Sequence, residues 1–388
     1  MTTGKGLKMS DIRGYVKPGF EAVHDAFKDN FDRDEELGAG FAVFQDGECL
    51  IDLQGGWVDR KKTAPFEANT LTPIFSTTKP IAALVVAYIV DQAPGVTLDS
   101  LMTEFWPEFG AKGKEDLTIA DVLSHQSGLC GFEEAIDPKL WLDPRALNAH
   151  LAETEPLWLP VPDGTSGYHP LTWGYLAGEI VERLAGRSLG TVLAEDFTGT
   201  LEGGEDMIDF WIGTPKSQHE RISEVQRPRE MAKLGAMNRY NKAAFMTSWS
   251  APERGTTEWR ETEIPSANGH GTARSVAQLY AAFANGGKVG RASIGSDTWN
   301  DFLTLRTSGQ DRVLPFIIEF ACGVMRNNSG FYGPNPESWG HSGWGGSAAF
   351  GDPDNRLSCA YVMNKQSAHL QGDPRSQRLF DAVYECVD

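Results

Sequence analysis

Cysteine is scarce in this sequence and follows no pattern. The five cysteines in 388 residues form neither a Cys-x-x-Cys pair nor a spacing typical of metal sites. The eight histidines contain no His-x-His or His-x-x-x-His pair. A disulfide framework and a zinc centre are therefore disfavoured, and we expect reduced thiols and no bound metal.

Long apolar runs and clusters of basic residues are also missing. The longest apolar run, 80–90, is too short to cross a bilayer, and residues 1–19 contain no apolar stretch of the signal-peptide kind. A net charge of −18 repels phosphate backbones. We therefore expect a cytoplasmic protein with no membrane and no nucleic-acid partner. The oligomeric state is not predicted.

Apolar periodicity and turn residues predict helices and strands in both halves of the chain. Asp46-Gly47 is a strong two-residue hairpin signal between two strands. The predicted strands are 39–45, 48–57, 316–325, 347–351 and 357–364. The predicted helices are 20–31, 77–92, 118–124, 172–184, 229–244, 272–285 and 375–387.

This order predicts an α+β fold with an antiparallel sheet flanked by helices. The strands come from both chain ends and a mostly helical domain is inserted between them. We expect one discontinuous domain, 1–75 with 275–388, and a second domain, 76–274, with the active site between them.

The first chemical motif is Ser76-Thr77-Thr78-Lys79, where strand-like residues give way to an apolar helix. Residues three apart are neighbours on a helix, and a partly desolvated lysine can take a proton from serine. No other lysine in the chain has serine at this offset. The alternative is an ordinary helix cap, Ser76, followed by a solvated lysine.

Two further motifs carry possible active-site groups. Tyr168 lies in the loop 164–170 before a helix, where a nearby lysine would lower its pKa and make it a base. The glycine-rich run 339–347 lets a substrate approach the backbone. The alternatives are a packing aromatic for Tyr168 and a simple chain reversal for the glycine-rich run.

In this order, the three motifs resemble those of the serine β-lactamase and penicillin-binding-protein superfamily, in its class C-like branch. The family VIII carboxylesterases are the most similar group. Ser76 and Lys79 match Ser-x-x-Lys, Tyr168 takes the place of the tyrosine in Tyr-x-Asn, and His341-Ser342-Gly343 takes that of Lys-Thr-Gly. The run 123–129 is similar to Leu-x-His-x-Ser-Gly-Leu, and the resemblance extends from about residue 20 to about residue 385.

The resemblance implies a β-lactamase/transpeptidase-like fold and acyl-enzyme chemistry without a metal or organic cofactor. Ser76 would attack an acyl carbonyl while Lys79 and Tyr168 share its proton, and Tyr168 would later activate water. The backbone N–H groups of Ser76 and Trp344 would bind the oxyanion. The other substrate-binding positions would be His125, His341, Gly343, Trp344, Gly345 and Gly346.

Two departures from the family pattern predict the substrate. His341 replaces a lysine that attracts a carboxylate, and it should be mostly neutral at pH 7. Pro170 replaces the asparagine of Tyr-x-Asn and has no polar side-chain group. Both changes favour a carboxylesterase that cleaves small neutral esters. A β-lactamase, a D-amino peptidase, an oligoamide hydrolase and a catalytically silent binding protein remain as alternatives.

Two other features have competing interpretations. Gly186-Arg187-Ser188-Leu189-Gly190 matches the nucleophile motif of α/β-hydrolases, but a helix precedes it, so we expect Gly186 to end that helix and Ser188 to be structural. The segment 203–265 is rich in Met, Phe and Trp, and either covers the substrate pocket or forms the core of the helical domain.

Overall fold

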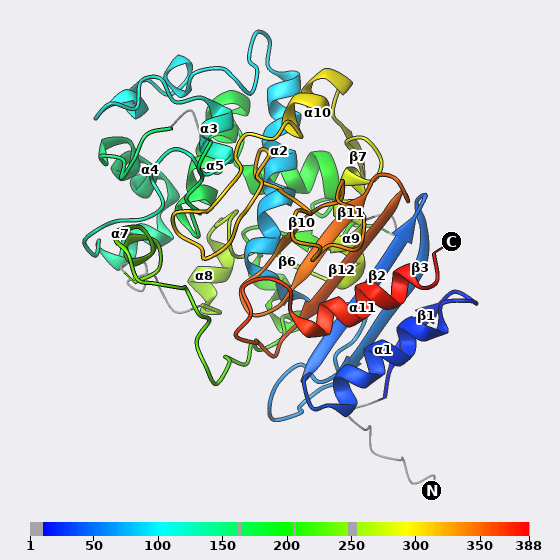
Figure 1. Ribbon diagram of the computed structural model, residues 1–388. Helices are drawn as coiled ribbons and strands as arrows, with labels where there is room; N and C mark the ends of the chain where they lie inside the picture. Colours follow the sequence, from blue (N-terminus) through cyan, green and yellow to red (C-terminus); the bar gives the residue numbers. More distant parts are fainter. Residues whose placement is uncertain (1–10, 161–163, 205–206, 247–253, 388) are drawn as a thin grey trace, which may run out of the picture.

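The computed structural model describes residues 11–160, 164–204, 207–246 and 254–387, and a seven-stranded sheet is its main element (Figure 1). The strand order is β1-β3-β2-β12-β11-β10-β9, and every neighbouring pair is antiparallel. The strands are β1 (Arg13–Val16), β2 (Gly38–Gln45), β3 (Glu48–Gly56), β9 (Met325–Arg326), β10 (Trp339–Ser342), β11 (Ala348–Asp352) and β12 (Leu357–Met363). This confirms the predicted antiparallel sheet with strands from both chain ends.

The β2–β3 hairpin forms where the sequence predicted it. Asp46 and Gly47 have φ of 51° and 81°, the left-handed pair that a type I′ turn needs. Strand β12 then pairs with β2, with Cys359 opposite Val43, and joins the two ends of the chain.

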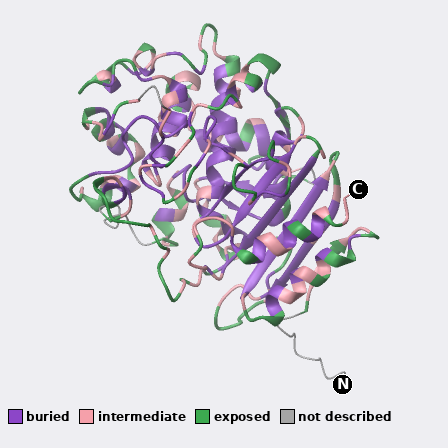
Figure 2. Ribbon diagram, in the orientation of Figure 1, coloured by how far each residue is buried: buried purple, intermediate pink, exposed green. Residues whose placement is uncertain are grey.

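Helices cover both faces of the sheet. Figure 1 shows α1 (Glu21–Asp32) and α11 (Pro374–Tyr384) side by side on one face, where Phe380 packs edge-on against Phe350 with ring centroids 4.9 Å apart. Helix α9 (Ala273–Tyr280) covers the other face. A Cβ on Gly40 of β2 would lie 3.2 Å from that of Ala273, so glycine permits this close approach. The inner strands of the sheet are buried, whereas the edge strand β1 is partly exposed, and α1 and α11 expose their outer sides (Figure 2).

The remaining helices surround α2 (Thr78–Gln92), which runs through the middle of the molecule (Figure 1). Every residue from Thr78 to Ala87 is buried, as expected for a helix that is apolar on all sides. The other α-helices are α3 (Ile119–Leu123), α4 (Pro144–Glu153), α5 (Thr172–Ala185), α6 (Leu189–Val192), α7 (Arg239–Asn241), α8 (Thr257–Glu261) and α10 (Ser296–Phe302).

Short segments connect these elements. The 3-10 turns are η1 (Phe75–Thr77), η2 (Met102–Glu104), η3 (Pro107–Gly110), η4 (Pro138–Leu142), η6 (Lys216–Arg221) and η9 (Ala281–Phe283), and the π-turns are η5 (Leu193–Thr198) and η7 (Lys242–Met246). The short strands outside the main sheet are β4 (Thr72–Pro73), β5 (Phe210–Trp211), β6 (His270–Gly271), β7 (Lys288–Val289) and β8 (Ala292–Ser293).

Two predicted elements are wrong. The helix 229–244 is largely irregular, because Gly235 takes a φ of 74° and the side chain of Asn238 caps the short α7 that begins just after it. The predicted strand 316–325 is irregular except for its last residue, Met325, which begins β9; before it the segment makes isolated bridges, such as Gln310 with Ile317, and Gly323 interrupts it with a φ of 78°. Strand β1 and helices α4 and α10 were not predicted.

The division into domains 1–75 with 275–388 and 76–274 stays a prediction. Within the described ranges, the helices all fall short of the length and apolar character that a membrane span requires.

Candidate active site

Ser76 lies in a strained turn at the start of the central helix. Phe75, just before it, has a φ of 49°, a left-handed conformation that is unusual for a bulky residue and often marks functional sites. The 3-10 turn η1 contains Ser76 and runs directly into α2. Ser76 is partly exposed while Phe75 and Thr77 are buried, so its hydroxyl is at the surface of an otherwise closed turn.

Lys79 is fully buried and its amine contacts Ser76. Nζ lies 3.1 Å from Ser76 Oγ, 2.9 Å from the carbonyl oxygen of Pro170 and 3.0 Å from that of Ser266. Burial holds the pKa of Lys79 well below its usual value. A neutral amine has two hydrogens, which the two carbonyls accept, so its lone pair is left for the Ser76 hydroxyl.

Tyr168 joins this group, but one expectation about it was wrong. The Nζ atom of Lys79 lies over the Tyr168 ring, 4.7 Å from its centre. Burial raises the pKa of Tyr168, and a hydrogen bond with Ser76 lowers it only in part. Tyr168 is therefore a neutral phenol at pH 7, able to donate and pass on a proton, and not the phenolate that the sequence suggested.

A buried carboxylate that the sequence analysis missed holds the Tyr168 loop. The carboxylate of Asp311 accepts the Ser166 hydroxyl at 2.6 Å and the Tyr168 N–H at 3.0 and 3.1 Å. It also accepts the N–H groups of Val313 and Leu314, both at 2.8 Å. Its partners Ser166 and Tyr168 lie about 145 positions before Asp311 in the chain. A local sequence motif could therefore not indicate this contact.

Three buried imidazoles surround the site. Nδ1 of His125 accepts the N–H of His169 at 3.0 Å, and Nδ1 of His341 lies 2.8 Å from the Ser342 carbonyl and donates to it. Burial lowers the pKa of all three, to about 3 for His169 and His341, so they are neutral at pH 7. This agrees with the neutral His341 that the sequence predicted. The bond from the His169 N–H is a structural contact of His125, and the expected part of His125 in substrate binding stays a prediction.

The glycine-rich run leaves the end of β10 and touches the Ser76 turn. The N–H of Gly343 donates to the Ser347 carbonyl at 2.7 Å, and the Ser347 hydroxyl donates to the Ile74 carbonyl at 2.8 Å. A Cβ on Gly343 would lie 2.3 Å from that carbonyl, so only glycine fits. Among the described residues, the N–H of Trp344 finds no hydrogen-bond acceptor.

Aromatic and cationic side chains border Trp344. The ring of Phe245 is 6.0 Å from that of Trp344, and the guanidinium of Arg254 lies 5.5 and 5.8 Å from the rings of Phe75 and Trp344. Phe245 and Arg254 belong to the segment 203–265, so part of this segment borders the site. Of its other large residues, Phe210, Trp211 and Trp259 are buried, Met231, Met237 and Met246 are exposed, Met207 is half-buried, and Trp249 lies outside the described residues.

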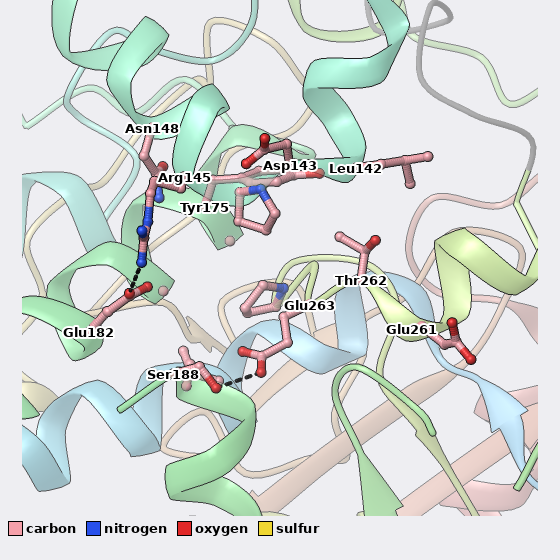
Figure 3. A pocket seen from close by; sticks show the side chains of 15 residues that line it. Leu142, Asp143, Arg145, Asn148, Tyr175, Glu182, Ser188, Glu261, Thr262 and Glu263 are labelled. Carbon is pink, nitrogen blue, oxygen red and sulfur yellow. Dashed lines mark hydrogen bonds and ion pairs between the residues drawn. The ribbon is translucent and has the colours of Figure 1, made fainter. Parts of the chain in front are cut away.

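A cavity of about 350 Å³ lies elsewhere, beside Ser188 (Figure 3). Its lining includes none of Ser76, Lys79 and Tyr168. Ser188 caps α6, and its hydroxyl donates to Glu263 at 2.6 Å; within the described ranges it makes no hydrogen bond to a lysine, histidine or tyrosine. Gly186 ends α5 with a φ of 65°, as predicted. The cap on α6 supports the structural interpretation of Ser188.

The arrangement of Ser76, Lys79 and Tyr168 under a glycine-rich strand end has clear relatives. The family model described as Beta-lactamase matches residues 24–383. The chain belongs to the beta-lactamase family. It is 30% identical over 371 residues to "Esterase/beta-lactamase LipL" of Mycobacterium tuberculosis, covering 91% of this chain and 83% of LipL.

Two solved structures are similar over nearly the whole chain. One is a penicillin-binding protein homologue from Caulobacter crescentus, with 46% identity, a TM-score of 0.90, and coverage of 97% of this chain and 100% of that one. The other is a family VIII carboxylesterase, with 35% identity, a TM-score of 0.88 and the same coverage. The protein is therefore a serine hydrolase of the beta-lactamase family with family VIII esterase-like features.

Proposed function

We propose that the protein is a carboxylesterase that cleaves small neutral esters through an acyl-enzyme on Ser76. The contact between Ser76 and a buried, neutral Lys79 carries the proposal. Two carbonyls occupy the hydrogens of the amine and leave its lone pair for the serine proton. The esterase names of LipL and of the family VIII structure support the choice of ester substrates.

In the first half-reaction, Ser76 Oγ forms a bond to the ester carbonyl carbon as its proton passes to Lys79 Nζ. The carbonyl oxygen becomes an oxyanion, and the N–H groups of Ser76 and Trp344 bind it. When the intermediate collapses, the bond to the alcohol oxygen breaks. That oxygen takes the proton from Lys79, with the Tyr168 hydroxyl passing it on.

In the second half-reaction, water replaces the alcohol. Lys79 accepts a proton from water through Tyr168, and the water oxygen attacks the acyl carbon. The bond between this carbon and Ser76 Oγ then breaks, and Oγ recovers a proton from Lys79. One ester and one water give one alcohol and one carboxylic acid, and the protein returns to its starting state without a cofactor.

Two features favour neutral esters over peptides and β-lactams. His341 is neutral, because burial lowers its pKa to about 3, so it does not attract a carboxylate as a lysine would. Pro170 uses its carbonyl to bind Lys79 and has no side-chain amide for an amide substrate.

One observation favours a second candidate, hydrolysis of β-lactams. The Arg254 guanidinium lies over Phe75 and Trp344 and puts a positive charge beside the proposed oxyanion site. A β-lactam carboxylate could pair with it, and desolvation of the guanidinium, which lowers the pKa of Arg254, would strengthen such a pair.

The test compares p-nitrophenyl esters of increasing acyl length with nitrocefin. We expect turnover of short-chain esters by the wild-type protein, its loss in Ser76→Ala, and nearly full activity in Ser188→Ala. Faster turnover of nitrocefin than of esters would assign the β-lactam activity instead. A fluorophosphonate probe should label Ser76, and an unlabelled Ser76 would show a silent binding protein.

A further inference from the structure

Residues of the C-terminal segment donate hydrogen bonds to the carbonyls of Trp344 and Gly345, the two that follow the Trp344 N–H along the chain. The amide of Gln366 donates from Nε2 to the Trp344 carbonyl at 3.1 Å. The N–H of Ser367 and Nη2 of Arg375 donate to the Gly345 carbonyl at 2.9 and 3.1 Å. The Gly343 N–H is bound on the other side of Trp344, to the Ser347 carbonyl. The backbone of Trp344 is therefore fixed from both directions.

The guanidinium of Arg375 is itself held in one orientation. It binds Asp373 with two parallel hydrogen bonds, from Nε at 3.0 Å and from Nη2 at 2.8 Å. Its Nη1 donates to the Lys365 carbonyl at 2.7 Å and to Glu36 at 3.3 Å. Such a planar fork has little freedom to rotate, so the remaining Nη2 hydrogen points at Gly345.

Contacts between this ion cluster and the loop are tight. A Cβ on Gly346 would lie 2.4 Å from Asp373 Oδ2 and 2.5 Å from Arg375 Nη2. Gly345 and Gly346 also have φ of 92° and 122°, which other residues rarely adopt. The loop therefore has no space to move toward α11.

The cluster is costly for stability alone. Arg375, Asp373 and Glu36 are at most 4% exposed, and taking charged groups out of water has a desolvation cost that apolar side chains of similar volume would avoid. Burial raises the pKa of Glu36 to about 7, even though Arg375 acts to lower it. A role in fixing the geometry of the loop explains why two hydrogen bonds, from Ser367 and Arg375, converge on the Gly345 carbonyl.

We infer that Arg375, together with Gln366, positions the backbone N–H of Trp344 to bind the oxyanion. The inference rests on the proposed function, since it needs an oxyanion at Ser76. Neither side chain touches the substrate. Both act through the carbonyls of Trp344 and Gly345, which set the direction of the adjoining peptide groups.

A positioning role has a distinct kinetic signature. An oxyanion forms only in the transition state, so a displaced N–H lowers kcat and leaves KM nearly unchanged. Removing a whole oxyanion donor costs about 10²–10³ in kcat, and a misdirected donor should cost less, about 10–100-fold. A purely structural role would lower Tm and the fraction of active sites, but not kcat per active site.

The experiment uses Arg375→Lys, Gln366→Met and the matched control Arg378→Lys in the full chain. Arg378 lies one turn further along α11 and pairs with Glu35 and Asn30, away from the glycine-rich loop. Active sites are counted from the end point of fluorophosphonate labelling, and kcat and KM are measured with p-nitrophenyl butyrate. Inhibition by a trifluoromethyl ketone, which forms an oxyanion on serine, is measured beside them.

We expect kcat per active site to fall about 10–100-fold in Arg375→Lys and less in Gln366→Met, with KM within about twofold of the wild-type value. The inhibition constant of the ketone should rise in parallel, and Arg378→Lys should match the wild type. If Arg375→Lys does not fold, Gln366→Met decides, because it leaves the ion cluster intact. Unchanged kcat in the folded variants would overturn the inference, whereas an unlabelled wild-type Ser76 would overturn the proposed function.

Discussion

Replacing Gly343 by alanine tests the contact between the glycine-rich run and the Ser76 turn. The added Cβ would lie 2.1 Å from Ser347 Oγ, 2.3 Å from the Ile74 carbonyl oxygen and 2.9 Å from Thr77 Oγ1. The Ser347 hydroxyl can rotate away. The Ile74 carbonyl is less free to move, because it accepts the N–H of Thr77 at 3.2 Å and so closes the turn that contains Ser76.

The size of the effect follows from these distances. The contact with the Ile74 carbonyl is roughly 1 Å shorter than an ordinary van der Waals separation. The two segments must therefore move apart by about that amount, which carries the N–H of Trp344 away from Ser76. A misplacement of about 1 Å can cost about 10²-fold in rate. Overpacking of this kind also destabilises a protein by about 1–3 kcal/mol.

The assay is kcat/KM for p-nitrophenyl butyrate, with Tm measured by calorimetry. We expect Gly343→Ala to lose about 100-fold in kcat/KM and several degrees in Tm. Gly178→Ala is the control, because Gly178 lies in α5 and its added Cβ would meet only Pro265, at 4.0 Å. That variant should keep its activity and be slightly stabilised by the better helix propensity of alanine.

Retention of wild-type activity by Gly343→Ala would refute this reasoning. It would mean that the loop and the Ser76 turn can separate without harm, and that Trp344 does not bind the oxyanion. Loss of activity in Gly178→Ala as well would point to general sensitivity of the fold rather than to this contact.

Two further predictions concern the buried charges of the site. Burial lowers the pKa of Lys79, so its neutral form is more abundant than that of a solvated lysine at the same pH. Activity should fall only as the pH drops through this lowered pKa, where the amine becomes protonated. Lys79→Arg should lose about 10²–10⁴-fold in kcat/KM at every pH. A pH–rate profile from pH 4 to 10 checks both expectations. Asp311→Asn replaces one carboxylate oxygen, which accepts hydrogen bonds from the Tyr168 loop, by an amide group that donates. We therefore expect kcat to fall about 10–100-fold with little change in KM. A kcat within threefold of the wild-type value would contradict the role of Asp311 in holding Tyr168.

Local sequence patterns predicted much of the sheet and the central helix. The Asp46-Gly47 turn and the strands around it needed only residues that are neighbours in the chain. The helix predicted at 229–244 was wrong because the prediction relied on apolar spacing alone. Gly235, with its positive φ, and Asn238, whose side chain caps α7, both end or begin helices rather than continue them. The strand predicted at 316–325 was wrong because its apolar residues pack in an irregular segment.

At the candidate site, the three-residue spacing of Ser76 and Lys79 was enough to predict that their side chains are neighbours. Their protonation depends on the packed environment. Burial lowers the pKa of Lys79, whose amine also contacts the carbonyls of Pro170 and Ser266, and burial of Tyr168 raises the pKa of its phenol. A pKa depends on desolvation and on partners far away in the chain, and no local spacing contains that information.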